Sequence, residues 1–197
     1  MIEFTRKTKE TTIELIFDPY GSGISDIETG IGFFDHMLTT FAFYANINLT
    51  IKATGDLHVD THHTAEDVGI VLGNAIHAFM KSMPSVERFG NATIPMDEAL
   101  VRSVMDLGGR RYLKCDLPRL SERLGTFESD SIMPFLDAFS SNAWMTLHIN
   151  VLEGSNSHHI VEALFKSLGR SLKMALTPNN SAIASIKGNP EIRGGAL

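Results

Sequence analysis

The sequence predicts an α+β protein made of two similar halves, each a small β-sheet with two helices on one face. A short polar motif, His-His-x-x-Glu, occurs at residues 62–66 and again at 158–162. Around these motifs other residues repeat in the same order, namely Leu38 and Leu136, Phe41 and Phe139, Leu49 and Leu147, Ile51 and Ile149, Leu72 and Leu168, and Gly73 and Gly169. Identities that keep their order around a shared motif indicate an internal duplication.

The first half contains strand and helix patterns in turn. Residues 11–18 alternate between apolar and polar, which is typical of a half-buried strand, and the GSG sequence at 21–23 predicts a turn. A helix is predicted over 33–45 and a strand over 47–53. From Thr61 onward apolar residues recur at helical spacing, which predicts a longer helix.

The second half also contains strand and helix patterns in turn. We expect three strands at 91–97, 99–107 and 110–116, a helix at about 130–142, a strand through Leu147, Ile149 and Val151, and a helix at about 157–176. Each half is therefore predicted to be β-β-β-α-β-α, with the first repeat at 1–90, the second at 91–177, and a C-terminal loop and tail at 178–197.

Composition narrows the class of protein. The 197 residues, 43% hydrophobic and 20% charged, are typical of a folded globular chain. A net charge of −6 without a basic run argues against nucleic acid or an anionic membrane as a partner. No apolar stretch approaches the roughly 20 residues of a membrane span, and the N-terminus lacks the apolar core of a signal peptide. With one cysteine, Cys115, no disulfide can form within the chain, so a cytoplasmic protein is expected.

The two motifs have the spacing of metal-ligand sets. Residues four apart on a helix share a face, so the first histidine of each motif lies beside its glutamate. The second histidine lies about 100° further round the helix, so a pair of metals could take one histidine each. Nitrogen and oxygen ligands without thiolate suit manganese, iron or zinc alike. The candidate ligands are His62, His63, Glu66, His158, His159 and Glu162, with Thr61 and Ser157 as expected helix N-caps.

Several segments together resemble imidazoleglycerol-phosphate dehydratase, an enzyme of histidine biosynthesis. They are GIGFFDHML at 30–38, DTHHTAEDVGI at 60–70, DLGGRRYL at 106–113 and HHIVEALFKSLGRSLKMAL at 158–176, within a similarity that runs from TKET at 8–11 to SIKG at 185–188. The resemblance implies a duplicated α+β subunit and two manganese(II) ions per active site. It also implies a large symmetric homo-oligomer whose sites form between subunits.

The resemblance further implies roles for individual residues. His36 would be another metal ligand, and Glu10 would carry acid–base chemistry together with the motif residues His62, Glu66 and Glu162. The substrate phosphate would be held by Arg88, Arg110, Ser185 and Lys187, with Glu10 also contacting the substrate. The implied reaction is a lyase reaction on a phosphorylated imidazole. It dehydrates imidazoleglycerol phosphate to imidazole-acetol phosphate through an imidazolate held between two manganese ions.

The chain departs from the family pattern at three positions. Pro134 stands where the second-half counterpart of His36 is expected, so Asp137 or water would have to replace that ligand. Tyr44 and Thr61 stand where relatives usually carry histidine and aspartate.

Two alternative functions therefore stay open, a non-catalytic metal-binding paralogue and a dinuclear metallohydrolase. Glu10 and the phosphate residues favour the dehydratase, because metal storage needs neither, and dinuclear hydrolases usually use aspartate-rich ligand sets.

Overall fold

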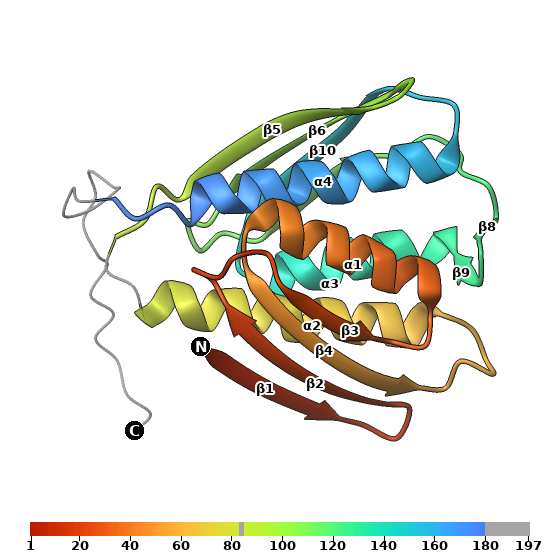
Figure 1. Cartoon of the computed structure of the whole chain (residues 1–197), viewed down its shortest axis with the longest axis horizontal. Helices are drawn as coiled ribbons and strands as arrows, with labels where there is room; N and C mark the ends of the chain where they lie inside the picture. Colours follow the sequence, from red (N-terminus) through yellow and green to blue (C-terminus); the bar gives the residue numbers. More distant parts are fainter. Residues whose placement is uncertain (83–84, 180–197) are drawn as a thin grey trace, which may run out of the picture.

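The computed structural model describes residues 1–82 and 85–179 (Figure 1). The first half consists of β1 (Ile2–Lys7), β2 (Thr11–Asp18), β3 (Ser25–Glu28), α1 (Gly32–Ala45), β4 (Asn48–Gly55) and α2 (His62–Ser82). The second half consists of β5 (Phe89–Met96), β6 (Ala99–Asp106), β7 (Tyr112–Asp116), β8 (Arg123–Leu124), β9 (Phe127–Glu128), the 3₁₀ helix η1 (Ser129–Ser131), α3 (Ile132–Asn142), β10 (Thr146–Glu153) and α4 (Ser157–Ala175).

The two main sheets have the same topology, which confirms the predicted α+β fold. The strand orders are β1-β2-β4-β3 and β5-β6-β10-β7. In both sheets the last pair, β3 with β4 and β7 with β10, is parallel and the other pairs are antiparallel. The β8–β9 hairpin and η1 are additions to the second half that the sequence did not predict. The expected boundary between residues 90 and 91 falls inside β5. None of the helices in residues 1–82 and 85–179 combines the length and apolar character needed to cross a membrane.

The helices lie between the two sheets, and each packs against a helix of the other half (Figure 1). α2 contacts α3, where Gly73 lies so close to α3 that a Cβ there would be 2.6 Å from the carbonyl oxygen of Phe139. α4 contacts α1 in the same way, because a Cβ on Gly169 would lie 2.6 Å from the carbonyl oxygen of Phe41. These are matching positions of the sequence repeat. One core therefore joins both halves, and residues of α1 are brought beside residues of α4.

These close helix contacts give a test of the packing. Replacing Gly73 or Gly169 with alanine is expected to lower the free energy of unfolding by about 1–3 kcal/mol, because the clashing atom is a backbone oxygen that cannot rotate away. Gly32→Ala is the matched control, since a Cβ there would meet nothing within 4 Å. Urea denaturation of the three variants makes the comparison. An unchanged unfolding midpoint in both packing variants would contradict this account of the interface.

The expected N-cap position is confirmed at α2, where Thr61 directly precedes the helix and its carbonyl oxygen accepts the backbone N–H of Ala65 at 3.1 Å, but it is wrong at α4. Ser157 is the first residue of α4 and not its N-cap, because Asn156 occupies that position and its side chain accepts the backbone N–H groups of the histidine pair. At α2, Asp60 Oδ1 accepts the backbone N–H of the first histidine at 2.8 Å. The Thr61 hydroxyl lies instead 2.8 Å from Ser131 Oγ. An Asx side chain before the helix thus binds the backbone N–H of the first histidine in both motifs.

Candidate functional site

A group of three potential metal ligands forms where α1 and α4 meet. Its members are His36 of α1 and His158 and Glu162 of α4, and one ligand atom from each lies within 4.8 Å of the others. Glu162 Oε2 lies 3.1 Å from His158 Nε2 and 3.6 Å from His36 Nε2. Two imidazoles and one carboxylate suit a divalent transition metal such as manganese, iron or zinc. The structure therefore brings together ligand candidates that come from opposite halves of the sequence.

The second carboxylate oxygen of Glu162 is held by a lysine. Lys166 Nζ lies 2.8 Å from Glu162 Oε1, and the side chains are only 14% and 12% exposed. Burial acts to raise the pKa of Glu162, but Lys166 and His158 oppose it and hold the pKa below its usual value. The carboxylate is thus kept ionised with one oxygen facing the histidines. The sequence analysis missed Lys166, although its spacing of four residues from Glu162 on a helix was a usable signal.

The first-half motif has fewer donors around it. His62 Nε2 lies 3.6 Å from Glu66 Oε2. The position that matches His36 in the repeat is Pro134, in the first turn of α3, where a proline is tolerated but offers no ligand atom. Within residues 1–82 and 85–179, no third donor joins His62 and Glu66 in the way that His36 joins the second motif. The two motifs are therefore unequal within one chain.

Neighbouring histidine rings diverge, as the helical spacing predicts. The ring planes of His62 and His63 are 81° apart, with centroids separated by 5.9 Å. For His158 and His159 the corresponding values are 84° and 6.2 Å. The second histidine of each motif therefore faces different surroundings from the first.

Each second histidine meets a carboxylate that the sequence analysis did not identify. His63 Nδ1 lies 3.0 Å from Asp56 Oδ2, and His159 Nδ1 lies 2.6 Å from Glu98 Oε2. Hydrogen bonding to these carboxylates raises the pKa of both histidines. The hydrogen bond to His159, supported by backbone N–H groups, lowers the pKa of Glu98 to about 2.

Glu10 lies close to the first-half motif. It occupies the turn between β1 and β2, and its Oε2 is 3.9 Å from His63 Nδ1. Its side chain is 57% exposed. The structure thus places an accessible carboxylate beside a candidate metal ligand.

Two candidate phosphate residues converge on one aspartate. Asp106 lies 2.8 Å from Arg88 Nε through Oδ1 and 3.7 Å from an Arg110 guanidinium nitrogen through Oδ2. Arg88 has a left-handed backbone (φ +68°), and its N–H donates to the carbonyl oxygen of Ala175 at 2.9 Å. The Arg110 side chain is 79% exposed. Ser185 and Lys187 lie outside the described residues.

The arginine pair lies near the C-terminal ends of β6 and α4, whereas the histidine motifs lie at the N-terminal ends of α2 and α4, at the other end of the fold (Figure 1). Asp106 is the last residue of β6, and Glu98 directly precedes the first residue of that strand. At the rise of a β-strand, the two residues are therefore separated by roughly 26 Å. Along α4, His159 and Ala175 are separated by roughly 24 Å at the rise of a helix. Both distances indicate a gap of about 25 Å between the two groups of candidate residues.

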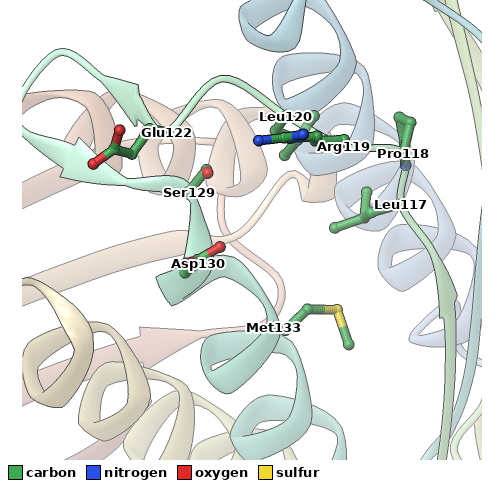
Figure 2. A pocket seen from close by; sticks show the side chains of 8 residues that line it. All are labelled: Leu117, Pro118, Arg119, Leu120, Glu122, Ser129, Asp130 and Met133. Carbon is green, nitrogen blue, oxygen red and sulfur yellow. The ribbon is translucent and has the colours of Figure 1, made fainter.

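The candidate metal ligands lie on an open surface. The side chains of His36, His62 and His158 are 53%, 46% and 47% exposed. A pocket of about 610 Å³ is instead lined by residues of the segments 117–122 and 129–133 (Figure 2). No residue of either motif lines this pocket. In the part of the chain that the structure describes, these three histidines are therefore accessible to solvent.

Cys115 is not positioned for nucleophilic chemistry. It lies on β7 with its side chain partly buried. Burial raises the pKa of its thiol to about 12, so almost no thiolate is present at neutral pH.

Comparison with known proteins identifies the family of the chain. A family model described as imidazoleglycerol-phosphate dehydratase matches residues 29–172. The chain is similar to imidazoleglycerol-phosphate dehydratase of Thermoanaerobacter sp. (strain X514), with 53% identity over 188 residues that cover 94% of this chain and 97% of that relative.

Solved structures extend the similarity to the fold. Imidazoleglycerol-phosphate dehydratase from Staphylococcus aureus subsp. aureus N315 matches with a TM-score of 0.81 and 37% identity, covering 91% of this chain and all (100%) of that one. IGPD from Pyrococcus furiosus in complex with (S)-C348 matches with a TM-score of 0.81 and 38% identity, covering 94% and 99% of the two chains. The chain belongs to the imidazoleglycerol-phosphate dehydratase family.

Proposed function

We propose that this chain is a hydro-lyase that dehydrates imidazoleglycerol phosphate to imidazole-acetol phosphate in histidine biosynthesis, using two manganese(II) ions per active site. Family membership supports the reaction. The observation that carries the metal proposal is the convergence of His36, His158 and Glu162 from two separate helices. These donors come from opposite halves of the chain, and such a convergence is not expected of an ordinary solvated surface.

The metal ligands would be the residues of both motifs together with one histidine of α1. They are His36, His62, His63, Glu66, His158, His159 and Glu162. The donor set is compatible with manganese, iron or zinc, and the choice of manganese rests on the family resemblance. When bound, the ions would supply Lewis-acid chemistry that eases proton loss from the substrate's imidazole.

The chain's own carboxylates would move the protons. Removal of water requires one proton to leave a carbon and another to reach the departing hydroxyl group. Glu10 is suited to this work because it is exposed and lies 3.9 Å from a motif histidine. A general base must come within hydrogen-bonding reach of the proton that it takes, and the Glu10 side chain can extend toward a molecule bound beside that histidine.

Arg88 and Arg110 would hold the substrate phosphate. A guanidinium can bind phosphate with two parallel hydrogen bonds, and two guanidinium groups beside one another match its charge. Asp106 orients Arg88, whose Nε faces its carboxylate at 2.8 Å, and the pair of arginines keeps a net positive charge beside it. Ser185 and Lys187 would complete the group.

A complete site would need more than one copy of the chain. The arginine pair lies about 25 Å from the histidine motifs of the same chain, whereas a three-carbon chain alone separates the imidazole of the substrate from its phosphate. The open position of the metal ligands points the same way, because a second chain can cover them. We therefore infer a large symmetric homo-oligomer in which the motifs of one subunit face the arginine pair of another.

Pro134 supports a second candidate, a non-catalytic metal-binding paralogue. It removes the donor that would complete the first-half motif, so one metal would have fewer protein ligands than the other. In such a paralogue the metals would bind without turnover. The exposed Glu10 and the arginine pair favour the enzyme, because metal storage requires neither.

The test is to strip the protein of metal and titrate it with manganese while following dehydration of imidazoleglycerol phosphate and counting bound ions. Activity that rises and saturates near two ions per subunit would support the enzyme and show that Pro134 is compensated. Magnesium is the control, since it prefers an all-oxygen octahedral shell and should not restore activity. Manganese binding without turnover at any concentration would favour the non-catalytic paralogue.

A further inference from the structure

Glu10 and Glu98 occupy equivalent positions in the two halves. Glu10 directly precedes β2, and Glu98 directly precedes β6. In β2, the residue that pairs with Leu49 is the seventh after Glu10. In β6, the residue that pairs with Leu147 is likewise the seventh after Glu98. Leu49 and Leu147 are themselves matching positions of the repeat. Each sheet thus presents one hairpin glutamate to the second histidine of the motif in its own half.

The two hairpin glutamates make different contacts. Glu98 Oε2 lies 2.6 Å from His159 Nδ1, while its Oε1 accepts the backbone N–H groups of Asn156 at 2.7 Å and Ser155 at 3.3 Å. Glu98 therefore ties the loop before α4 to the histidine ring. Glu10 remains 3.9 Å from the corresponding atom of His63, beyond hydrogen-bonding distance.

In the first half a different carboxylate holds the second histidine. Asp56, just after β4, places Oδ2 3.0 Å from His63 Nδ1. Each second histidine therefore has one close carboxylate on Nδ1. The Nε2 atom of His159 faces away from Glu98 toward the exposed Asp97, 3.7 Å away.

A carboxylate on one ring nitrogen decides what the other nitrogen can do. It keeps the proton on the nitrogen that it faces, so the opposite nitrogen of a neutral imidazole carries the free lone pair. Histidines that bind metals commonly have such a partner, which fixes both the tautomer and the ring orientation.

We propose that Glu98 is a positioning residue that holds His159 with Nδ1–H turned inward and Nε2 presented to a metal ion, as Asp56 does for His63. Because Asp56 has this task in the first half, Glu10 is the hairpin glutamate left for proton transfer. The duplicated hairpin carboxylates have thus diverged, one toward positioning and one toward chemistry. This inference rests on the proposed function, because it states which nitrogen of His63 and His159 faces a metal ion in the proposed metal site.

The test compares manganese affinity in the full-length protein, measured without substrate from the electron paramagnetic resonance signal of free Mn²⁺. Glu98→Ala is expected to weaken binding of one ion about 10- to 100-fold, the usual effect of losing a carboxylate behind a metal-binding histidine. Glu98→Gln should recover part of that affinity, because its amide oxygen can still accept the Nδ1–H. Glu153→Ala, which removes an exposed carboxylate at the end of β10, is the matched control.

Turnover at saturating manganese separates positioning from catalysis. The Glu98→Ala variant should then approach wild-type kcat, whereas Glu10→Gln should bind manganese normally and lose kcat. Unchanged manganese affinity in Glu98→Ala would overturn the inference, as would a kcat deficit that excess manganese does not repair. If the wild type binds manganese but does not dehydrate the substrate, the proposed function fails, while the affinity comparison still tests Glu98.

Discussion

Replacement of Glu162 with alanine is expected to abolish dehydratase activity, lowering kcat/KM by about 1,000-fold or more, and to weaken manganese binding. A bound metal ion contributes several kcal/mol to catalysis, and each 1.36 kcal/mol is a factor of about ten in rate. In the three-residue group, one oxygen of Glu162 lies close to both histidine rings. Loss of Glu162 leaves the two imidazoles beside Lys166, whose positive charge has then lost its carboxylate partner and repels a metal.

The control for this variant is Glu14→Ala, which removes an exposed carboxylate from the middle of β2. Both variants should be assayed over a manganese titration, with circular dichroism to confirm that they fold. Glu162→Gln, which keeps the side-chain volume, guards against a loss of folding in the alanine variant. Wild-type turnover by Glu162→Ala at limiting manganese would contradict the assigned ligand role.

Replacement of Arg110 with alanine is expected to lower kcat/KM by about 10- to 100-fold, mainly through a higher KM. A charge-assisted hydrogen bond to an ionised group contributes about 1.5–3 kcal/mol, which corresponds to this range. The Arg110 side chain is 79% exposed, so its removal should leave the fold intact. Replacement of Arg88 should also lower stability, because its side chain is largely buried and its Nε faces Asp106 Oδ1 at 2.8 Å.

Arg111→Ala is the matched control for Arg110→Ala. The Arg111 guanidinium lies over the ring of Trp144 at 4.0 Å, and in the described part of the chain the ion pairs of Asp106 are made by Arg88 and Arg110. Steady-state kinetics on the two variants should show a raised KM for Arg110→Ala alone. Equal KM values for both variants and the wild type would remove Arg110 from the phosphate site.

Much of the fold was predictable because the repeat occurs in elements with strong periodicity. The long helices and the strands with apolar residues at every second position were located within a few residues of their ends. β1 and β3 were not located, because β1 is polar and only half-buried and β3 has four residues. The β8–β9 hairpin has strands of two residues, too short to leave a periodic pattern.

The site was predictable to the extent that its ligands share a helical turn. His158 and Glu162 are four residues apart, so their meeting follows from helix geometry. Their meeting with His36 does not, because it depends on how α1 and α4 pack across the two halves. Asp56 and Glu98 were missed for the same reason. Each reaches its histidine through a sheet edge or a loop, and no local spacing encodes that contact.

The measurement that tests the central claim most directly is complementation between two impaired variants, assayed at substrate concentrations well below KM. Chains carrying Glu162→Ala and chains carrying Arg110→Ala would be co-expressed with different tags, and mixed assemblies would be purified on both tags. If the motifs of one subunit face the arginine pair of another, random mixing should make about a quarter of the sites fully wild type, with about that share of wild-type activity. Mixed assemblies no more active than the two variants alone would show that both groups act within one chain and would contradict the shared site.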